Sequence, residues 1–268
     1  MSLIRRSAGG RLPYAALVRR VEIDQPFIWV IGGWRDFLAA PVASLGYGAI
    51  FVVIGVGLTQ ALIRARMSYM LLPLISGFML LGPVLSVGFY AMSRGQEHNR
   101  RPSLSDALLA WRATPGPIFN AALAFLFLFL VWLRLSQLLF ALTAPYAAGL
   151  DVHDLSRALV FTPSGQTFLV LFVLLGAVTA TIAFACGAFT LQIMLDRNVG
   201  LAEAVSISAT AVWMNVEAMA YWAAILVVLV AAGFMLVYVG LAVTLPIAGH
   251  ASWRAYRSTI LPQRLGRR

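Results

Sequence analysis

The sequence predicts an all-α fold, a polytopic bundle of transmembrane helices, and three observations point to it. Of the 268 residues, 61% are hydrophobic and only 11% are charged, whereas a soluble domain carries about 25% charged residues. The apolar residues gather into long runs without charge, and a helix needs roughly 20 such residues to cross the hydrocarbon core. The arginines lie between these runs and at both ends of the chain, as in cytoplasmic loops.

Four spans follow directly from the apolar runs, and the last run allows two interpretations. The four runs predict spans at about 42–62, 69–92, 118–140 and 166–194. The last charge-free stretch, 218–253, is too long for one ordinary span and short for two. One helix there gives five spans. A tight hairpin that turns near Gly233 gives six, the last two at 218–234 and 237–257.

The positive-inside rule favours six spans. With a cytoplasmic N-terminus, five spans would leave a strongly basic tail outside: Arg254, Arg257, Arg264, Arg267 and Arg268. Six spans return this tail to the cytoplasm. We therefore expect both termini in the cytoplasm of a bacterium and a multi-pass protein of its inner membrane. The parts are an arginine-rich arm (1–31), a membrane domain (32–260) and a basic tail (261–268). The arginines on or near the outer side are then Arg64, Arg66, Arg134 and Arg157.

A weak internal repeat supports the same count. "SLSDALLAW" (103–111) and "GLAEAVSIS" (200–208) share a pattern of small, acidic and aliphatic residues, and each follows an even-numbered span. "GGWRDFLAAP" (32–41) precedes the first span in the same way. Ser103 and Asp106 form a helix-start pair of the Ser-x-x-acid kind. The pattern predicts three hairpins, each preceded by a short interfacial helix, a type of repeat common in transporters.

The ends of two even spans also match. Tyr90 and Arg94 follow Pro83 by seven and eleven residues, and Trp253 and Arg257 follow Pro246 at the same distances. From such positions we expect interface anchors at Trp34, Arg35, Tyr90, Arg94, Asp196, Arg197, Trp253, Tyr256 and Arg257. Asp196 is expected to pair with Arg94, Arg112 or Arg257. Small residues and prolines predict helix packing or kinks at Gly46, Gly48, Gly77, Gly82, Pro83, Gly88, Pro246 and Gly249.

Motifs for chemistry are missing from the sequence. His98, His153 and His250 are far apart, and no HxxxH or HExxH pattern occurs, so we expect no metal site. We expect no cofactor, and His250 is only a weak candidate for a haem ligand. No nucleophile elbow, phosphate-binding loop or pair of carboxylates within a span is present, so we expect no enzyme. Arg134, near the outer end of its span, is expected to snorkel to the interface.

Several stretches resemble a known bacterial family. These are "GWRDF", "SLGYG", "LLPLISGFMLLGPVLSVGFYAMSR", "LDR" and "LPIAGHASWRAYR", and together they extend over about Gly33–Ile260. They resemble the integral-membrane family called domain of unknown function 2189. The resemblance implies a membrane fold and carries over no catalytic residue. Some members bear a label that links them to cytochrome c oxidase subunit I, but the paired membrane histidines that bind haem and copper there are missing here.

Two functions follow from this sequence. The first is a non-catalytic accessory or assembly subunit that packs against a larger membrane complex, for which the resemblance suggests the respiratory chain. The alternative is a transporter of a small molecule or lipid, built on the three-hairpin repeat. The expected partners are the membrane and other membrane subunits, with anionic lipids at the cytoplasmic arginines. Nucleic acid is not expected, because the arginines follow the pattern of membrane topology.

Overall fold

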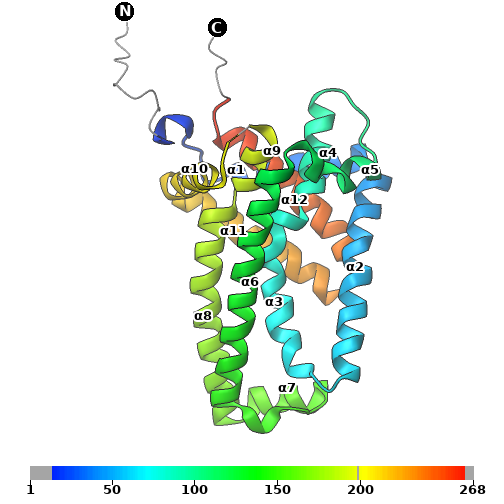
Figure 1. The fold of residues 1–268 in the computed structure, drawn as a ribbon, viewed down its shortest axis with the longest axis vertical. Helices are drawn as coiled ribbons and strands as arrows, with labels where there is room; N and C mark the ends of the chain where they lie inside the picture. Colours follow the sequence, from blue (N-terminus) through cyan, green and yellow to red (C-terminus); the bar gives the residue numbers. More distant parts are fainter. Residues whose placement is uncertain (1–13, 198, 263–268) are drawn as a thin grey trace, which may run out of the picture.

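A computed structural model describes residues 14–197 and 199–262 of the chain. The predicted arm residues 1–13 and the tail arginines Arg264, Arg267 and Arg268 lie outside this part. Every element within it is a helix, apart from one isolated β-bridge between Val18 and Ile260. The long helices run side by side, and the short ones gather mainly at one end (Figure 1). The all-helical expectation is thus confirmed for the described residues.

Five stretches are long and apolar enough to cross a membrane. They are α2 (Pro41–Arg64), α3 with α4 (Leu71–Leu85, Val87–Glu97), α6 (Pro115–Thr143), α8 with α9 (Pro163–Gly187, Thr190–Asp196) and α11 (Val216–Met235). The remaining helices are α1 (Gln25–Ala39), α5 (Leu104–Leu108), α7 (Val152–Phe161), α10 (Leu201–Met214) and α12 (Leu241–Thr259), with 3-10 turns η1 (Tyr14–Leu17), η2 (Ser68–Met70), η3 (Ala110–Ala113) and η4 (Pro145–Ala147).

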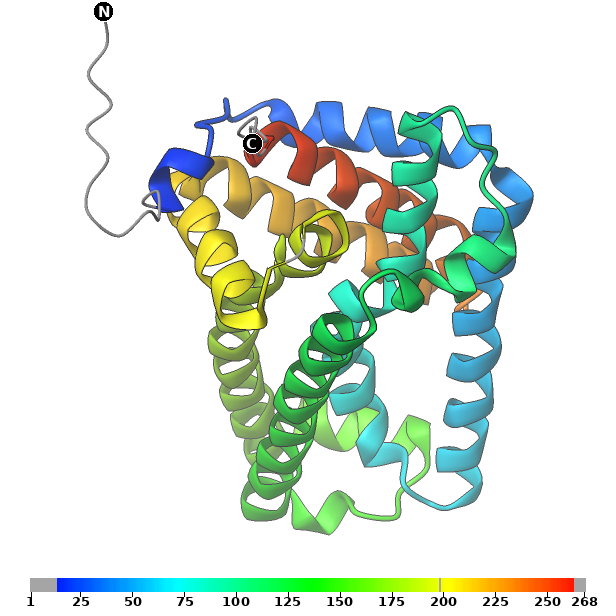
Figure 2. The same cartoon turned by 45° about the horizontal axis from the view of Figure 1, so that its top comes forward.

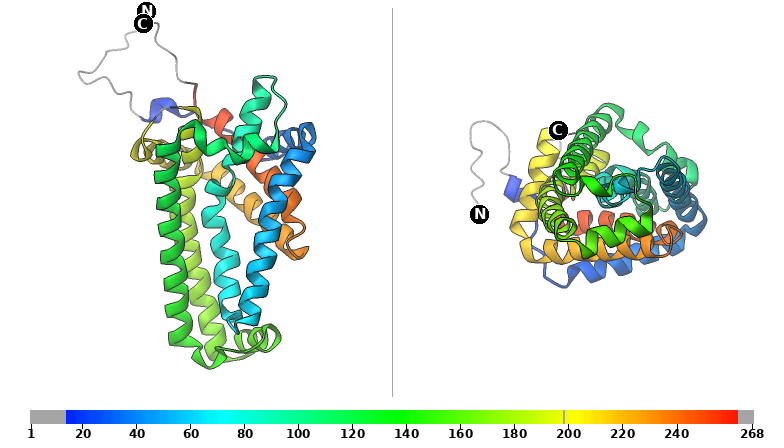
Figure 3. Two further views of the ribbon diagram at one scale, coloured as in Figure 1. Left: turned by 45° about the vertical axis from the view of Figure 1, so that its right-hand side comes forward. Right: turned by 90° about the horizontal axis from the view of Figure 1, so that it is seen from below.

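The sixth expected span, 237–257, is not among these candidates. It corresponds to α12, whose second half is rich in polar residues. Helices α11 and α12 are joined by a turn over 236–240, where Val237 and Tyr238 both have positive φ. They run obliquely, and their turn lies part-way along the bundle, short of the end that carries α7 (Figures 1 and 3). The hydroxyls of Tyr238 and Thr59 of α2 lie 2.7 Å apart there.

The two ends of the described chain meet. The N–H of Arg19 donates to the carbonyl of Thr259 (2.8 Å), and the N–H of Leu261 donates to the carbonyl of Leu17 (2.9 Å). The same end of the bundle carries α1, α4, α5, α9 and α10 (Figure 1). We call it the polar end. The opposite end carries the turn between α2 and α3 and helix α7.

Two of the spans bend near the polar end, for different reasons. The α3–α4 span is interrupted at Ser86, one turn after Pro83, which has no N–H to donate. The α8–α9 span lacks such a proline and breaks at 188–189 instead. The hydroxyl of Ser208 is inserted there: it donates to the carbonyl of Ala185 (3.0 Å) and accepts the N–H of Phe189 (3.1 Å). A side chain that enters the helical ladder in this way produces a kink.

The short helices pack in a cyclic order. Helix α5 contacts α4, α10 contacts α8 and α9, and α1 contacts α12. Helices α5 and α10 thus each pack on the span that precedes them, and α1 packs on the last helix, α12. The capping box expected at Ser103 and Asp106 is confirmed at the start of α5. The first predicted hairpin is splayed, however: α2 packs mainly on α12, and α3 mainly on α6.

The most extensive helix contact joins α1 to α12. They lie side by side across the polar end, with α11 next to them (Figure 2). A Cβ placed on Gly33 would lie only 2.5 Å from the backbone nitrogen of Ala251. On Gly32 it would meet Cγ of the Arg254 side chain, at 3.1 Å, and no backbone atom is among its nearest contacts. Only Gly33 is therefore required by the backbone approach.

We predict that Gly33→Ala destabilises the protein and Gly32→Ala does not. The added methyl at Gly33 must push α1 away from α12, and overpacking of this kind costs about 1–3 kcal/mol. Gly32→Ala keeps the contact between α1 and α12, and replacing a glycine within a helix by alanine stabilises the helix by about 0.5–1 kcal/mol. Thermal unfolding of both variants in the same detergent provides the measurement. Equal melting temperatures for the two variants would contradict the close approach.

Candidate functional site

Polar side chains of α12 form the centre of the polar end. His250, Trp253, Arg254, Tyr256 and Arg257 project from successive turns and reach α1, α2, α4 and α9. We call these five residues the α12 stripe. Most of the stripe is buried, with His250 and Trp253 at 0% exposure. Because buried polar groups are costly unless bonded, the partners of this stripe determine how α12 can sit.

His250 lies between two serines. The hydroxyl of Ser44, on α2, is 3.0 Å from Nε2, and the hydroxyl of Ser93, on α4, is 2.7 Å from Nδ1. Ser93 in turn donates to Oδ2 of Asp36 on α1, at 2.9 Å. Ser44, Ser93 and Asp36 are all buried. One chain of hydrogen bonds therefore ties α1, α2 and α4 to α12.

The acceptor at one end fixes the direction of this chain. The carboxylate of Asp36 can only accept, so the hydroxyl of Ser93 must donate to it. Ser93 then accepts from Nδ1–H of His250, so Nδ1 carries a proton. In a neutral imidazole, Nε2 accepts from the hydroxyl of Ser44. Burial, and secondly the charge of Arg254, lower the pKa of His250 to about 3, which agrees with that assignment.

Asp36 is held by an ion pair as well. Both Nε and Nη2 of Arg254 donate to its two carboxylate oxygens, the Nε bond being 3.0 Å long. This hydrogen bond, above all, raises the pKa of Arg254. The side chain of Gln96 donates to the backbone carbonyl of Asp36 at 2.9 Å. A buried carboxylate without its partner is strongly destabilising, so Asp36 and Arg254 depend on each other.

A second polar cluster lies one turn further along α12. Arg257 donates to Glu97 of α4 at 2.7 Å and to Asp196 of α9 at 2.9 Å. Arg94 of α4 lies 3.5 Å from Asp196 and donates to the carbonyl of Leu195 at 2.9 Å. The expected pairing of Asp196 with Arg94 or Arg257 is thus confirmed for both. The cluster joins the ends of α4, α9 and α12.

The aromatic residues of the stripe belong to the same cluster. Nε1 of Trp253 donates to Glu97 at 2.9 Å, and the hydroxyl of Tyr256 donates to Asp196 at 2.8 Å. The guanidinium of Arg257 lies 5.1 Å from the ring centre of Trp253. The sequence predicts both aromatic residues as anchors at the membrane interface, and this stays a prediction. Within the chain both are buried in the polar end, and so is Tyr90. Trp34 is exposed and stacks on Phe37.

The buried chain around His250 has the atoms of a proton relay but no access for a substrate. Ser44, Ser93 and His250 have no exposed surface, so neither hydroxyl can serve as a nucleophile in this conformation. What the arrangement does physically is hold four helices in one register. A fully bonded polar network of this type favours a single arrangement of its helices.

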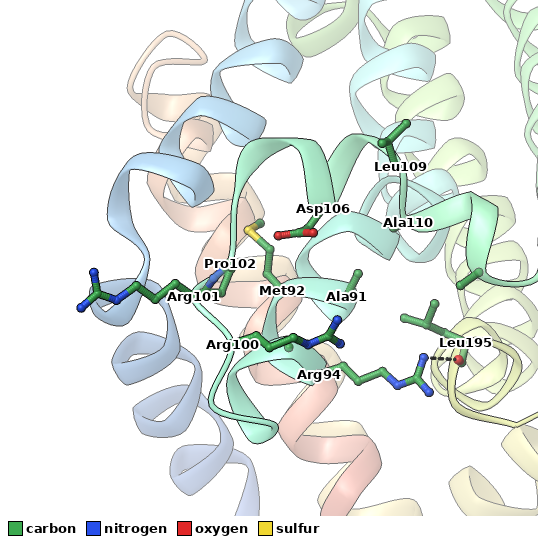
Figure 4. A pocket seen from close by; sticks show the side chains of 12 residues that line it. Ala91, Met92, Arg94, Arg100, Arg101, Pro102, Asp106, Leu109, Ala110 and Leu195 are labelled. Atoms are coloured by element: carbon green, nitrogen blue, oxygen red, sulfur yellow. Dashed lines mark hydrogen bonds between the residues drawn. The ribbon is translucent and has the colours of Figure 1, made fainter.

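Two openings at the polar end are more accessible. A cavity of about 360 Å³ lies between α4, α5, η3 and the end of α9, with Arg94, Arg100 and Asp106 among its lining residues (Figure 4). A shallower groove of about 440 Å³ runs along α1 and α12, where Arg35, Arg254 and Arg257 line it. Both are polar in part, and both lie beside the networks rather than within them.

The expected packing residues divide into two groups. A Cβ would come within 3 Å of another element at Gly48 (Ala242), Gly77 (Phe129), Gly88 (Tyr47) and Gly249 (Phe89). At Gly46 the side chain of Leu104 is 3.6 Å away, and at Gly82 nothing lies within 4 Å. The prolines Pro83 and Pro246 lie inside α3 and α12. The first group packs within this chain, whereas Gly82 faces open space.

The other singled-out residues lie away from the networks. Arg134, near the end of α6, donates to Gln137 at 3.2 Å and is solvent-accessible. Arg197 is nearly buried and donates to the carbonyl of Leu261. The side chain of His98 bonds the carbonyl of Arg94 at 2.8 Å. Sequence spacing missed a group at the opposite end, where Asp151, His153 and Asp154 offer ligand atoms within 4.8 Å of one another. All three are exposed, and Asp151 already caps α7.

Comparison with known families gives one match, which covers a segment of the chain. Residues 71–196 match the family model described as a predicted integral membrane protein (DUF2189). The resemblance noted in the sequence is therefore confirmed over this segment, from the start of α3 to the end of α9. The DUF2189 segment contributes Ser93, Arg94, Glu97 and Asp196 to the polar end, while the α12 stripe lies beyond it. No curated protein and no solved structure matches the chain.

We predict that acidification weakens the fold through His250. An unfolded histidine has a pKa of about 6.5, whereas the buried one has a pKa of about 3. The unfolded state therefore binds the proton first. The stability due to neutral His250 is complete above pH 6.5 and is lost as the pH falls towards 3. At pH 5 the loss is about 2 kcal/mol relative to pH 7.

The measurement is the melting temperature in detergent at pH 7 and pH 5. His250→Gln should lower stability at pH 7 but remove most of this pH dependence. His98→Gln, at an exposed histidine, is the matched control and should retain it. If His250→Gln shows the same pH dependence as the unmodified chain, the assignment of a neutral, buried imidazole is wrong.

Proposed function

We propose that this integral membrane protein is a non-catalytic accessory or assembly subunit that packs against a larger membrane protein complex. The supporting observation is how little of each span is covered within the chain. In the most apolar window of each candidate span, only 17–28% of the residues are buried. The rest of each helix face meets either lipid or another membrane protein.

Helix α2 and the α8–α9 span are the least covered, each with 17% of its most apolar window buried. The buried residues of α2 are all in the first third: Ala43, Ser44 and Gly48. Further along, Tyr238 at the tip of the α11–α12 hairpin fits against Gly55 and bonds Thr59. Nothing lies within 4 Å of a Cβ on Gly57. Small residues let helix backbones approach closely in lipid, so this face suits a partner helix.

The polar end suits a cytoplasmic location. Its helices and loops together carry most of the described arginines, and the positive-inside rule assigns such an end to the cytoplasm of a bacterial inner membrane. In that orientation α11 and α12 form a hairpin that enters from the cytoplasmic side and turns within the membrane. The arginines of this face would attract anionic lipids, at about 1 kcal/mol per charge. A respiratory complex is the partner that the family resemblance suggests.

Transport is the alternative, and one observation favours it. An oblique helical hairpin that turns part-way through a bundle is a feature of transporter folds, in which broken helices line the substrate site. Against this, both openings described above lie at the polar end rather than beside the hairpin tip. The core near the middle of α6 and α8 is formed by Trp132, Phe168 and Phe172, together with other apolar residues. The accessory role is therefore the function that we propose.

The proposal predicts a stoichiometric membrane partner. After mild solubilisation, the tagged full-length protein should co-purify with that partner in a constant ratio. Gly57→Leu should reduce the recovered partner severalfold, because the added side chain blocks close approach at α2. Quantitative mass spectrometry of the purified complex provides the measurement.

Ala177→Leu is the matched control. It adds similar bulk at an exposed position of α8. It should leave the partner ratio unchanged. Recovery of the protein alone, under conditions that preserve other membrane complexes, would rule out the accessory role.

A further inference from the structure

The cavity beside α5 is the feature that the proposed function leaves unexplained. Its walls come from α4, from the loop that follows, from α5 with η3, and from Leu195 at the end of α9 (Figure 4). It is about 360 Å³ in volume, room for roughly a dozen water molecules at about 30 Å³ each. Gly95 forms part of its floor, and nothing lies within 4 Å of a Cβ placed there.

Two arginines with side chains on the same side line the cavity. Figure 4 shows Arg100 and Arg94 following one another in the same direction, Arg94 toward Leu195, while the side chain of Arg101, which also lines the cavity, points away. Arg94 is fixed in place, because it donates to the carbonyl of Leu195 and lies near Asp196. Arg100 makes no ion pair with a described carboxylate. Two adjacent cations, one of them free to bond, match the oxygens of a phosphate group.

A carboxylate lies across the cavity from these cations. Asp106 projects from α5 into the space opposite Arg94 and Arg100 (Figure 4). The capping box holds it there, since its Oδ2 accepts from the N–H and the hydroxyl of Ser103. These bonds also lower the pKa of Asp106, so it is charged at neutral pH. A purely anionic ligand would be repelled by this carboxylate, whereas a ligand with a cationic group would be attracted.

The rim of the cavity is apolar on one side. Leu109 lines it, and Leu108 and Trp111 next to it are exposed. Arg112 lies over the ring of Trp111, 5.4 Å from its centre. An aromatic ring beside exposed leucines is typical of the membrane interface. A hydrocarbon chain attached to the ligand could therefore leave the cavity across this rim.

We propose that this cavity binds a phosphoethanolamine group, with the phosphate on Arg94 and Arg100 and the ammonium on Asp106. The ligand is a phosphatidylethanolamine headgroup or a free phosphoethanolamine, which share this chemistry. The inference rests on the proposed membrane setting only for the lipid source. Headgroup binding requires no partner subunit. If the cavity fails to bind the headgroup, the accessory role is unaffected, and if no partner subunit is found, headgroup binding is unaffected.

The test uses the full-length protein in detergent micelles. Phosphatidylethanolamine, phosphatidylglycerol and free O-phosphoethanolamine are titrated separately, and dissociation constants are measured. We expect phosphatidylethanolamine to bind severalfold more tightly than phosphatidylglycerol. Tight binding of the lipid alone would identify a membrane ligand, and equal binding of free phosphoethanolamine would identify a soluble one. Both outcomes support the site.

Three variants locate the binding. Arg100→Gln should weaken it about tenfold, the effect of one lost charge-assisted contact. Gly95→Ala should also weaken binding by narrowing the cavity, with an unchanged melting temperature because the added Cβ meets no neighbour. Arg101→Gln, from the same loop, is the control and should change affinity by less than twofold. Equal weakening by Arg100→Gln and Arg101→Gln, or tighter binding of phosphatidylglycerol, would overturn the proposal.

Discussion

The buried carboxylate of Asp36 is the constraint on which the polar end depends. A charge at 3% exposure is tolerated only when it is fully paired, and here each partner comes from a different helix. Arg254 of α12 neutralises it, and Ser93 of α4 donates to it. Through Ser93 the requirement extends to His250 and then to Ser44 of α2. One carboxylate therefore fixes the register of α1, α2, α4 and α12.

This constraint also explains how the last hairpin can sit obliquely. A helix that crosses a membrane fully is positioned by its apolar length, but α12 is too polar in its second half for that. Its stripe is anchored at the polar end instead, by Asp36 on one side and by Glu97 with Asp196 on the other. The apolar first half and α11 then extend into the bundle as far as Tyr238, which bonds Thr59. The ion pairs of Arg254 and Arg257 therefore hold the hairpin at the polar end. At the turn, the hydroxyl of Tyr238 bonds that of Thr59.

The amino-acid sequence was enough to predict the features that depend on the length of an apolar run or on a local residue pattern. Apolar run lengths predicted the first four spans, and the Ser-x-x-acid spacing predicted the cap of α5. The pairing of Asp196 with arginines followed from charge at one end of the bundle. Asp36, Ser93 and Glu97 were missed, because a single acid or serine next to a span has no pattern of its own. They become a site only when α12 packs against α1 and α4. The partners of Trp253 and Tyr256 could not be predicted either. These residue types are typical of a membrane interface, but in the structure their polar atoms donate to Glu97 and Asp196.

We propose that α12 is clamped at the polar end and that the α11–α12 turn therefore lies inside the membrane. Labelling of single cysteines by a membrane-impermeant maleimide tests it most directly, in a Cys186→Ser background. Val237→Cys at the turn should stay unlabelled in intact cells and in inverted vesicles. Ser156→Cys in the exposed part of α7 should label from one side only. If Val237→Cys labels from that same side as fast as Ser156→Cys, the hairpin crosses fully and the account is contradicted.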